Sequence, residues 1–289
     1  MTLAAKSIVI TGAGRGIGRA CAILAAELGA SVIVNDIDAD VAGQVCADIV
    51  ANGGNALADD CDISTWSGAE AMVERCVSAF GGIDGLINNA ALFRPCRLTE
   101  ADEQIWRDTI ETNVLGVAFA TTHAARRMSA RGSGAIVNMT SAAHQGATNL
   151  APYGTSKGAV SSLTYCAALD LGPQGIRVNA VSPFAATRMV EAAAQFGAAS
   201  GHLSTAALPT PEENAAVACY LLSDAAHDFN GQIIRVERGG LSMLGHPVVL
   251  SPYPKGDTAN YAAVRDAMAD ELRKQFQPVG IHYGHLQYD

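Results

Sequence analysis

Tyr153 and Lys157 are the residues whose types and spacing most directly indicate chemistry. They lie four positions apart, so a helix would place both side chains on one face. A phenol with a pKa near ~10 is a weak base at neutral pH, but an adjacent ammonium favours the phenolate and lowers that pKa. The pair therefore predicts a general acid and base that moves a proton on or off an alcohol oxygen. On a solvated helix face, the same two side chains would have no chemical role.

A glycine-rich turn near the N-terminus indicates a nucleotide site. Gly12, Gly16 and Gly18 follow a β-branched apolar run and open a segment with helical apolar spacing. Backbone amides at such a helix start can cradle a pyrophosphate, because no β-carbons obstruct its approach. The spacing departs from the strict G-x-G-x-x-G pattern, so the strand–turn–helix context carries the interpretation. Arg15 and Ile17 lie in the same turn and are expected to contact the coenzyme.

Asp36 ends the second expected strand, eighteen residues after Gly18. A carboxylate at this place can bond the hydroxyls of an adenosine ribose. It also disfavours a 2′-phosphate, because like charges about 4 Å apart repel by roughly 4 kcal/mol at an effective dielectric of 20. Arg15 points the other way, since its guanidinium can contact a phosphate. We expect NAD as the coenzyme, and Arg15 leaves NADP open as the alternative.

The segments that must position these residues alternate between strand-like and helix-like patterns. Apolar runs rich in β-branched residues are followed by stretches of helical apolar spacing. Such alternation predicts a parallel sheet with helices on both faces. Right-handed crossovers restrict it to a doubly wound, Rossmann-like α/β fold with seven parallel strands in the order 3-2-1-4-5-6-7. The strands are expected at 7–10, 31–34, 56–58, 85–88, 135–139, 177–181 and 232–236.

The alternation stops before the C-terminus, and no linker divides the part that precedes it. We expect a single dinucleotide-binding catalytic domain over residues 1–244. Residues 245–289 would form an extension that packs on the same domain or on a neighbouring subunit. The extension contains a proline-rich piece with Pro247, Pro252 and Pro254, and an expected helix over 258–276. Residues 191–208 are rich in Ala, Gly and Ser and are expected to form a mobile segment over a cleft.

Two helices have N-termini that can be identified from capping residues. Thr210 is an expected N-cap, because Pro211 occupies the first helical position and Glu213 the third. A single long helix is expected over 102–128, with Thr99 and Asp102 resembling a capping box at its start.

Composition excludes several kinds of partner. Hydrophobic residues make up 49% and charged residues 16% of the 289-residue chain, which is sufficient for a large core. The net charge of −9 disfavours nucleic acids and anionic membrane surfaces. No apolar run approaches the ~18 residues of a membrane span, and the N-terminus lacks the pattern of a signal peptide. We expect a cytoplasmic protein that acts on a small molecule.

The cysteines and histidines do not indicate a metal site or a disulfide framework. None of the seven cysteines forms a C-x-x-C pair, and their number is odd. Such cysteines are typical of small buried residues in a protein from a reducing compartment. Cys166 and Cys219 are expected in the core. His282 and His285 are spaced three apart but have no further ligands nearby in the sequence, so no metal is expected.

Further motifs occur in the order found in one enzyme family. Over roughly residues 4 to 240, the chain resembles the short-chain dehydrogenases/reductases. Besides the glycine turn and the Tyr153–Lys157 pair, the matching pieces are Asp62-Ile63, Asn88-Asn89-Ala90, Asn113, the strand motif that ends at Ser141, and the segment from Arg177 to Pro183.

The resemblance implies a set of coenzyme contacts. Asp62 and Ile63 would meet the adenine. Pro183 would lie beside the nicotinamide, and Tyr153 and Lys157 would also touch the coenzyme. The remaining contacts that the resemblance implies come from Asn89, Ala90 and Thr187.

The resemblance also implies catalytic roles. Ser141 would hydrogen-bond the reacting oxygen and stabilise its developing charge. Asn113 would position a water that links Lys157 to solvent. Ser141 lies twelve residues before Tyr153, where the family usually shows thirteen, and Thr140 sits at thirteen. We choose Ser141, because its strand motif matches without a gap and a loop loses a residue more easily.

The function implied is hydride transfer between NAD and a secondary alcohol or ketone. Apolar residues around Phe184 indicate a hydrophobic substrate of hydroxysteroid, cyclic alcohol or 3-hydroxyacyl type. The family often associates through the long helix and the Tyr153 helix, so a homotetramer or homodimer is expected. Two alternatives are an NADP-dependent carbonyl reductase and a non-catalytic NAD-binding regulator.

Overall fold

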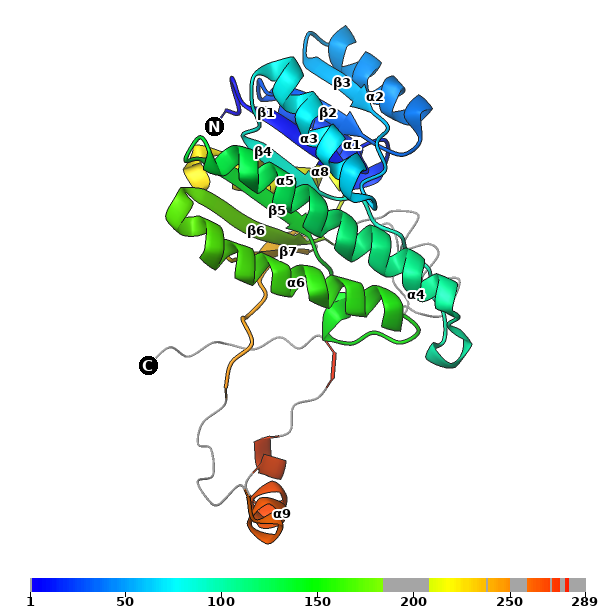
Figure 1. Cartoon of the computed structure of the whole chain (residues 1–289), viewed down its shortest axis with the longest axis vertical. Coiled ribbons are helices and arrows are strands. Elements are labelled where there is room, and N and C mark those ends of the chain that lie inside the picture. Colours follow the sequence, from blue (N-terminus) through cyan, green and yellow to red (C-terminus); the bar gives the residue numbers. More distant parts are fainter. Residues whose placement is uncertain are drawn as a thin grey trace. The chain divides into compact units, whose positions relative to one another are not determined.

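The computed structural model describes residues 2–183, 208–237, 239–249, 259–270, 272–275 and 279–280. The chain divides into two compact units, Met1–Leu244 and Gly245–Asp289. The first unit carries the sheet and its covering helices (Figure 1). The second contains α9 (Tyr261–Asp270) and a 3-10 turn, Leu272–Gln275, within the expected 258–276 helix. The segment expected over a cleft, 191–208, lies outside the described residues except for Leu208.

Eight strands form one sheet in the order β3-β2-β1-β4-β5-β6-β7-β8. Neighbours from β3 to β7 are parallel, which confirms the doubly wound order expected for seven strands. The number seven was wrong, because β8 adds an eighth strand antiparallel to β7. The strands are β1 (Ser7–Thr11), β2 (Ser31–Asn35), β3 (Asn55–Asp59), β4 (Gly85–Asn88), β5 (Gly134–Met139), β6 (Ile176–Ser182), β7 (Ile233–Glu237) and β8 (Gly240–Met243).

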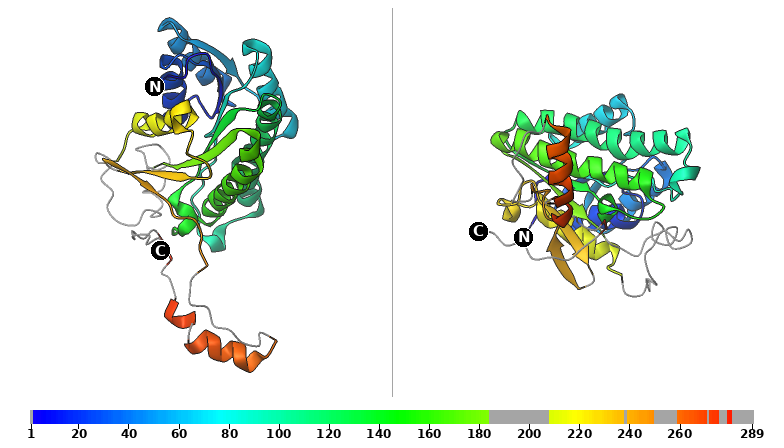
Figure 2. Two further views of the ribbon diagram at one scale, coloured as in Figure 1. Left: turned by 90° about the vertical axis from the view of Figure 1, so that its left-hand side faces the viewer. Right: turned by 90° about the horizontal axis from the view of Figure 1, so that it is seen from below.

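Helices cover both faces of the sheet, as Figure 2 shows from the side. One face packs against α1 (Gly16–Glu27), α2 (Ala39–Ala51) and α8 (Pro211–Leu222). The other packs against α3 (Trp66–Phe80), α5 (Val117–Ser129) and α6 (Ala151–Leu171). Successive strand residues belong to opposite faces, so Ile8 and Ile10 lie in one core cluster and Val9 in the other. Burying each such side chain contributes about 1.5–3 kcal/mol.

The expected long helix over 102–128 is present as one unbroken helical stretch, but a π-helical turn interrupts its α-helical bonding. It consists of α4 (Glu103–Ile110), a π-helical turn (Glu111–Gly116) and α5. Its N-cap is Asp102, whose carboxylate accepts a hydrogen bond from the amide of Ile105 at 2.7 Å. Thr99 instead lies in a preceding 3-10 turn, so the capping box expected there was wrong.

The expected start of α8 is confirmed. The Thr210 hydroxyl accepts a hydrogen bond from the amide of Glu213 at 3.3 Å, and the Glu213 carboxylate accepts one from the amide of Thr210 at 2.6 Å. α8 then packs against α1, where the thiol of Cys219 is buried beside the carbonyl of Cys21. Cys166 was expected in the core but is exposed, because position 166 falls on the outer face of α6.

The turn between β1 and α1 depends on close backbone approaches. A Cβ on Gly18 would lie 2.2 Å from the carbonyl oxygen of Gly12. A Cβ on Gly14 would lie 2.4 Å from Cγ2 of Val41 and 2.8 Å from Oδ2 of Asp36. Gly14 was not part of the expected motif, and its requirement comes from these contacts with the end of β2 and the start of α2.

We expect Gly14→Ala to lower the free energy of unfolding by about 1–3 kcal/mol, because the new methyl group overlaps Val41 and Asp36. Gly43→Ala is the matched control, since a Cβ at this α2 position meets nothing within 4 Å. It should stabilise the helix by about 0.5–1 kcal/mol. Urea denaturation measures both, and equal stability of the two variants would contradict the contact argument.

Candidate active site

Tyr153 and Lys157 both lie in the N-terminal part of α6, which begins at Ala151 with Pro152 in its first turn. Proline is favoured there because an N–H in the first turn would have no partner within the helix, so its absence costs no hydrogen bond. Both side chains are buried, with relative exposures of 9% for Tyr153 and 2% for Lys157. The helix therefore presents the phenol and the ammonium inward, on one face, as the spacing predicts.

Three hydrogen bonds fix this part of α6 to the end of β5. Lys157 Nζ donates to the carbonyl oxygen of Met139 at 2.7 Å. The Thr140 hydroxyl donates to the carbonyl oxygen of Lys157 at 3.0 Å and lies 2.7 Å from the hydroxyl of Ser161. These bonds therefore place the next residue in the chain, Ser141, close to the side chains of α6.

Ser141 starts the 3-10 turn Ala142–Gln145. Its hydroxyl accepts from the amide of Ala143 at 3.2 Å and lies near enough to the Tyr153 phenol to act on the pKa of that group. Thr140, the other residue considered at this place, directs its hydroxyl to Lys157 and Ser161 instead. The structure therefore places Ser141, rather than Thr140, against the phenol.

Burial sets the protonation of the pair. It raises the pKa of Tyr153 to about 12, although the nearby Ser141 hydroxyl acts in the opposite direction. It lowers the pKa of Lys157 to about 8. The expected lowering of the Tyr153 pKa by Lys157 is not found, because desolvation dominates and the ammonium is bonded to Met139. Lys157 Nζ lies 5.7 Å from the centre of the Tyr153 ring.

Asn113 lies in the π-helical turn between α4 and α5 and is fully buried. Its Nδ2 donates to the carbonyl oxygen of Leu92 at 2.9 Å and to the hydroxyl of Ser156 at 3.0 Å. Its Oδ1 accepts from the amide of Leu92 at 2.7 Å. The side chain thus joins the loop after β4 to α6. These bonds use both Nδ2 protons and one of the two acceptor sites of Oδ1, so the expected role in positioning a water stays a prediction.

Asn89 and Ala90 brace the glycine turn. Asn89 Nδ2 donates to the carbonyl oxygens of Thr11 at 3.1 Å and Gly12 at 2.9 Å. The backbone amides of Asn89 and Ala90 donate to the Thr11 hydroxyl at 3.0 and 3.1 Å. These bonds hold the end of β4 against the end of β1, and a Cβ on Gly18 would overlap Nδ2 of Asn89 at 2.5 Å.

The start of α1 fits a phosphate group. Gly16, Ile17 and Gly18 form its first turn, where backbone amides have no partner within the helix. The N-cap residue is Arg15, and no side chain caps this end. The turn therefore offers free amides, the positive end of the helix dipole and an unobstructed backbone, which together suit the pyrophosphate of a dinucleotide.

Asp36 follows β2 and points at the same turn. Its Oδ2 accepts from the amide of Gly14 at 3.0 Å, and its Oδ1 accepts from the amide of Asp38 at 3.1 Å. Arg15 donates to Oδ2 of Asp38 at 2.7 Å. The carboxylate expected to bind ribose hydroxyls is therefore held in place by backbone amides.

The remaining expected coenzyme contacts differ in their surroundings. Asp62 is exposed and accepts from the amide of Ser64 at 2.9 Å, whereas Ile63 is buried at 5% relative exposure. Ile63 packs near Gly116 of the π-helical turn. Pro183 directly follows β6. Thr187 and Phe184 lie outside the described residues.

One aromatic residue beside the phenol was missed by sequence analysis. The rings of Phe93 and Tyr153 meet edge to face, with 4.9 Å between centroids and 82° between planes. Phe93 comes four residues after Asn89, and no spacing rule identifies it. The contact makes one side of the phenol apolar.

No group of three or more metal-ligating side chains occurs in the described part of the chain, and His282 and His285 fall outside it. Within the same described residues, no helix has the length and apolar character needed to cross a bilayer.

The shifted pKa of Lys157 predicts how stability depends on pH. An unfolded lysine keeps its proton up to a pH of about 10.4, whereas Lys157 in the folded protein loses its proton near pH 8. Between these values the unfolded chain binds more protons, so stability rises with pH. We expect the free energy of unfolding of the wild type, relative to Lys157→Met, to increase from pH 8 to 10. Chemical denaturation across this range measures the difference, and a constant difference would contradict the burial argument.

Comparison with known proteins identifies the family. The family model described as enoyl-(acyl carrier protein) reductase matches residues 12–241. Cis-4-hydroxycyclohexanecarboxylate dehydrogenase of Sinomonas cyclohexanicum is 38% identical over 241 residues, covering 82% of this chain and 96% of the relative.

Solved structures agree with this assignment. A short-chain dehydrogenase from Mycobacterium avium superposes with a TM-score of 0.82 and 29% identity, covering 98% of this chain and 100% of the other. A 7α-hydroxysteroid dehydrogenase complexed with NADH and 7-oxo glycochenodeoxycholic acid gives a TM-score of 0.75 at 34% identity, covering 83% and 95%. The order of strands and the glycine turn of the present chain agree with these similarities. Together they show that the chain belongs to the short-chain dehydrogenases/reductases, a family of oxidoreductases.

Proposed function

We propose that the protein is an NAD-dependent dehydrogenase that interconverts a hydrophobic secondary alcohol and its ketone. The observation that carries the proposal is the approach of the Ser141 hydroxyl to the Tyr153 phenol, with Lys157 buried beside them. Two hydroxyls that meet in this way can both contact one substrate oxygen. They lie at the carboxyl ends of the strands, the edge at which open α/β sheets bind their ligands.

The residues divide the chemistry between them. A bound oxidised nicotinamide would accept the hydride of the carbinol carbon. Tyr153 would exchange a proton with the substrate oxygen, as a base in oxidation and as an acid in reduction. Ser141 would hydrogen-bond the same oxygen and stabilise its developing charge. Because the pKa of Tyr153 is raised to about 12, its phenol is protonated at neutral pH and suited to the acid role.

Lys157 and Asn113 would support this exchange. Lys157 would hold the nicotinamide ribose hydroxyls with the ammonium protons that Met139 leaves free. Asn113 bonds Leu92 and Ser156 through its side chain, so we assign it the positioning of α6. A water linking Lys157 to solvent would then be held by backbone groups of the π-helical turn, where the regular helical bonding is interrupted.

We propose that the coenzyme is NAD rather than NADP. The support is Asp36, whose carboxylate the amides of Gly14 and Asp38 fix beside the glycine turn. A fixed carboxylate can accept hydrogen bonds from ribose hydroxyls and repels a 2′-phosphate. Gly12, Gly16, Ile17 and Gly18 would contact the pyrophosphate. The remaining coenzyme contacts would come from Arg15, Asp62, Ile63, Asn89, Ala90, Pro183 and Thr187.

We propose a cyclic secondary alcohol as the substrate. The relatives with cyclohexanecarboxylate and steroid substrates support this class by analogy. The chain itself supplies an apolar surface next to the phenol, because the ring of Phe93 packs edge to face against Tyr153. A flat or cyclic apolar body fits such a wall better than a charged one.

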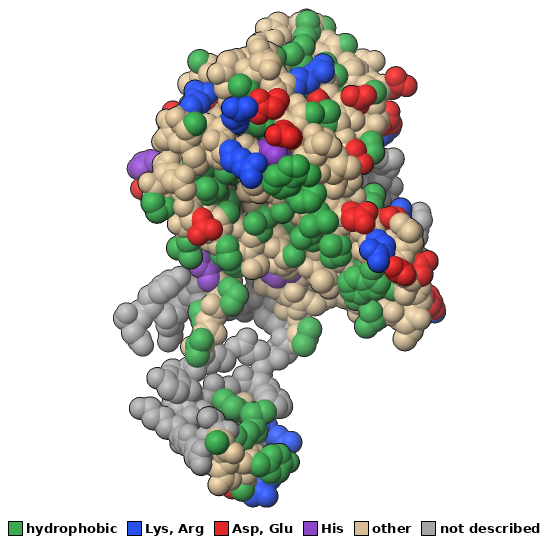
Figure 3. All heavy atoms as spheres, in the orientation of Figure 1, with side chains coloured by type: hydrophobic (Ala, Val, Ile, Leu, Met, Phe, Trp, Pro, Cys, Tyr) green, Lys and Arg blue, Asp and Glu red, His purple; other side chains and the backbone are tan. Residues whose placement is uncertain are grey.

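We further propose that the protein acts in the cytoplasm as a homo-oligomer. The cysteines, all described and all free, support a reducing compartment. Hydrophobic side chains gather over α5 and α6 in Figure 3. Exposed Trp66, Leu115 and Leu169 lie on this side of the fold, in α3, the π-helical turn and α6. This surface suits a second copy of the chain, in a dimer or a tetramer. Residues 245–289 would pack on the first unit or on a neighbouring subunit.

The proposed function predicts NAD reduction by secondary alcohols. Purified protein should increase absorbance at the wavelength of NADH with at least one cyclic secondary alcohol, and more slowly with NADP in place of NAD. Tight NAD binding without turnover on a broad panel would favour the non-catalytic regulator. A preference for NADP would favour a carbonyl reductase.

Tyr153→Phe should lower kcat by about 10²–10⁴-fold, because general acid–base catalysis contributes an effect of this size. Coenzyme binding, measured by fluorescence titration, should survive. Tyr165→Phe is the matched control, since it removes a phenol from the same helix away from Ser141 and should leave kcat nearly unchanged. A near-normal rate in Tyr153→Phe would refute the assignment.

A further inference from the structure

Arg15 and Asp38 form an ion pair at the edge of the proposed coenzyme site. We propose that Asp38 is a specificity-determining residue, which disfavours NADP by engaging the cation that would otherwise bind its 2′-phosphate. The inference rests on the proposed NAD-dependent function and extends it to a residue outside the expected site. It also resolves the opposing indications of Asp36 and Arg15 in the sequence.

The pair belongs to a closed ring of interactions. Arg15 Nη2 donates to Asp38 Oδ2 at 2.7 Å, and the amide of Asp38 donates to Asp36 Oδ1 at 3.1 Å. Asp36 Oδ2 accepts from the amide of Gly14 at 3.0 Å, and Gly14 precedes Arg15 in the chain. The ring therefore runs from the glycine turn to the end of β2 and back, and it fixes the guanidinium to a carboxylate.

The charges of the ring disfavour a phosphate. The hydrogen bond with Arg15 is the main cause that lowers the pKa of Asp38, so this carboxylate is ionised at neutral pH. Asp36, Asp38 and Arg15 then carry a formal charge of −1 together. A phosphate monoester adds about −1.5 to −2 at pH 7. Without the Asp38 charge, the group would be neutral and the guanidinium could form paired hydrogen bonds to the phosphate oxygens.

A structural explanation for the pair is weak. The side chains of Arg15 and Asp38 are 46% and 42% exposed, and exposed ion pairs contribute little to folding stability. The position of the pair at the glycine turn, rather than its exposure, points to an effect in ligand recognition. The same two helices carry a comparable pair, Arg19 and Asp48, at 3.1 Å with exposures of 45% and 36%.

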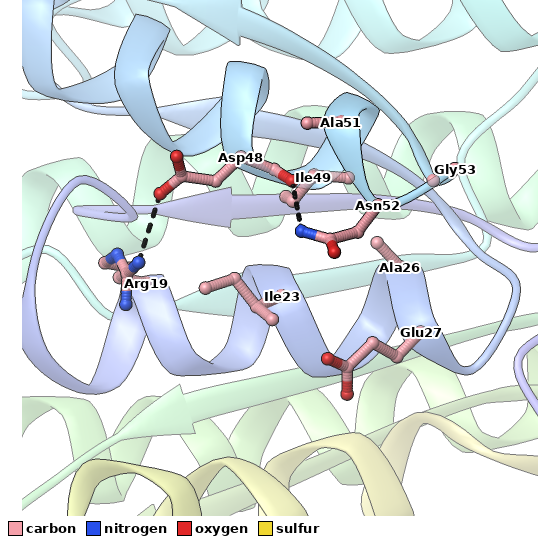
Figure 4. A pocket seen from close by; sticks show the side chains of 10 residues that line it. Arg19, Ile23, Ala26, Glu27, Asp48, Ile49, Ala51, Asn52 and Gly53 are labelled. Carbon is pink, nitrogen blue, oxygen red and sulfur yellow. Dashed lines mark hydrogen bonds and ion pairs between the residues drawn. The ribbon is translucent and has the colours of Figure 1, made fainter.

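Figure 4 shows Arg19 directed at Asp48 across the groove between α1 and α2. The groove is also lined by Ile23, Glu27 and Asn52, none of which belongs to the expected coenzyme contacts. Asp48→Asn therefore removes the same charge from the same kind of pair outside the site, which makes it a matched control for Asp38→Asn.

The test measures dissociation constants of NADH and NADPH by nicotinamide fluorescence in wild type, Asp38→Asn, Asp48→Asn and Arg15→Gln/Asp38→Asn. Asparagine keeps a good N-cap at the start of α2, and melting temperatures verify folding. The ratio of the NADPH constant to the NADH constant should fall by roughly three- to tenfold in Asp38→Asn. It should stay at the wild-type value in Asp48→Asn. The fall should be lost in the double variant, which lacks the freed guanidinium.

The possible outcomes separate this inference from the function on which it rests. An unchanged ratio in folded Asp38→Asn, or an equal fall in Asp48→Asn, would overturn the role of Asp38 while leaving NAD-dependent activity intact. A fall that persists without Arg15 would show general charge repulsion and also overturn the proposal. Wild-type protein that binds neither coenzyme would refute the proposed function and, with it, the inference.

Discussion

The attachment of α6 to the end of β5 is the constraint on which the candidate site depends. Lys157 bonds the carbonyl of Met139, and Thr140 bonds the backbone and Ser161 of α6. Each bond is buried, where an unpaired polar group would cost about 1–3 kcal/mol. The bonds of Lys157 and Thr140 avoid this cost, and they also hold Ser141 in a position that faces Tyr153. Two hydroxyls from separate elements can share one ligand atom only because the strand and the helix are joined at this point.

Much of this arrangement could be predicted from the sequence. The apolar runs of the strands, the glycine turn and the helix start at Thr210 are local signals, and the structure has these elements in the expected parallel order. The choice of Ser141 over Thr140 agrees with the geometry, because strand register fixes which side each residue faces. Local patterns succeed where backbone preference and burial favour the same conformation.

Other features depend on contacts that no local pattern contains. The pKa of Tyr153 is raised because the folded protein excludes water from the phenol, which neighbouring residue types alone do not reveal. Gly14 is required by Val41 and Asp36, which approach it only in the folded chain. β8 is too short and too exposed to give a strong strand signal. Phe184, expected near the substrate, and Thr187, an expected coenzyme contact, lie outside the described residues.

The π-helical turn between α4 and α5 reconciles two demands on one stretch of chain. Asn113 must face Leu92 and Ser156, whereas Ala120, Ala124 and Met128 must face the core under α3. A regular α-helix advances about 100° per residue, so one additional residue in a turn rotates everything that follows by that angle. The wide turn acts as a phase adjuster. It allows Asn113 to face the candidate site while the residues of α5 face the core. Inserting or deleting one residue in this segment would therefore turn one of these two sets of side chains away from its partners.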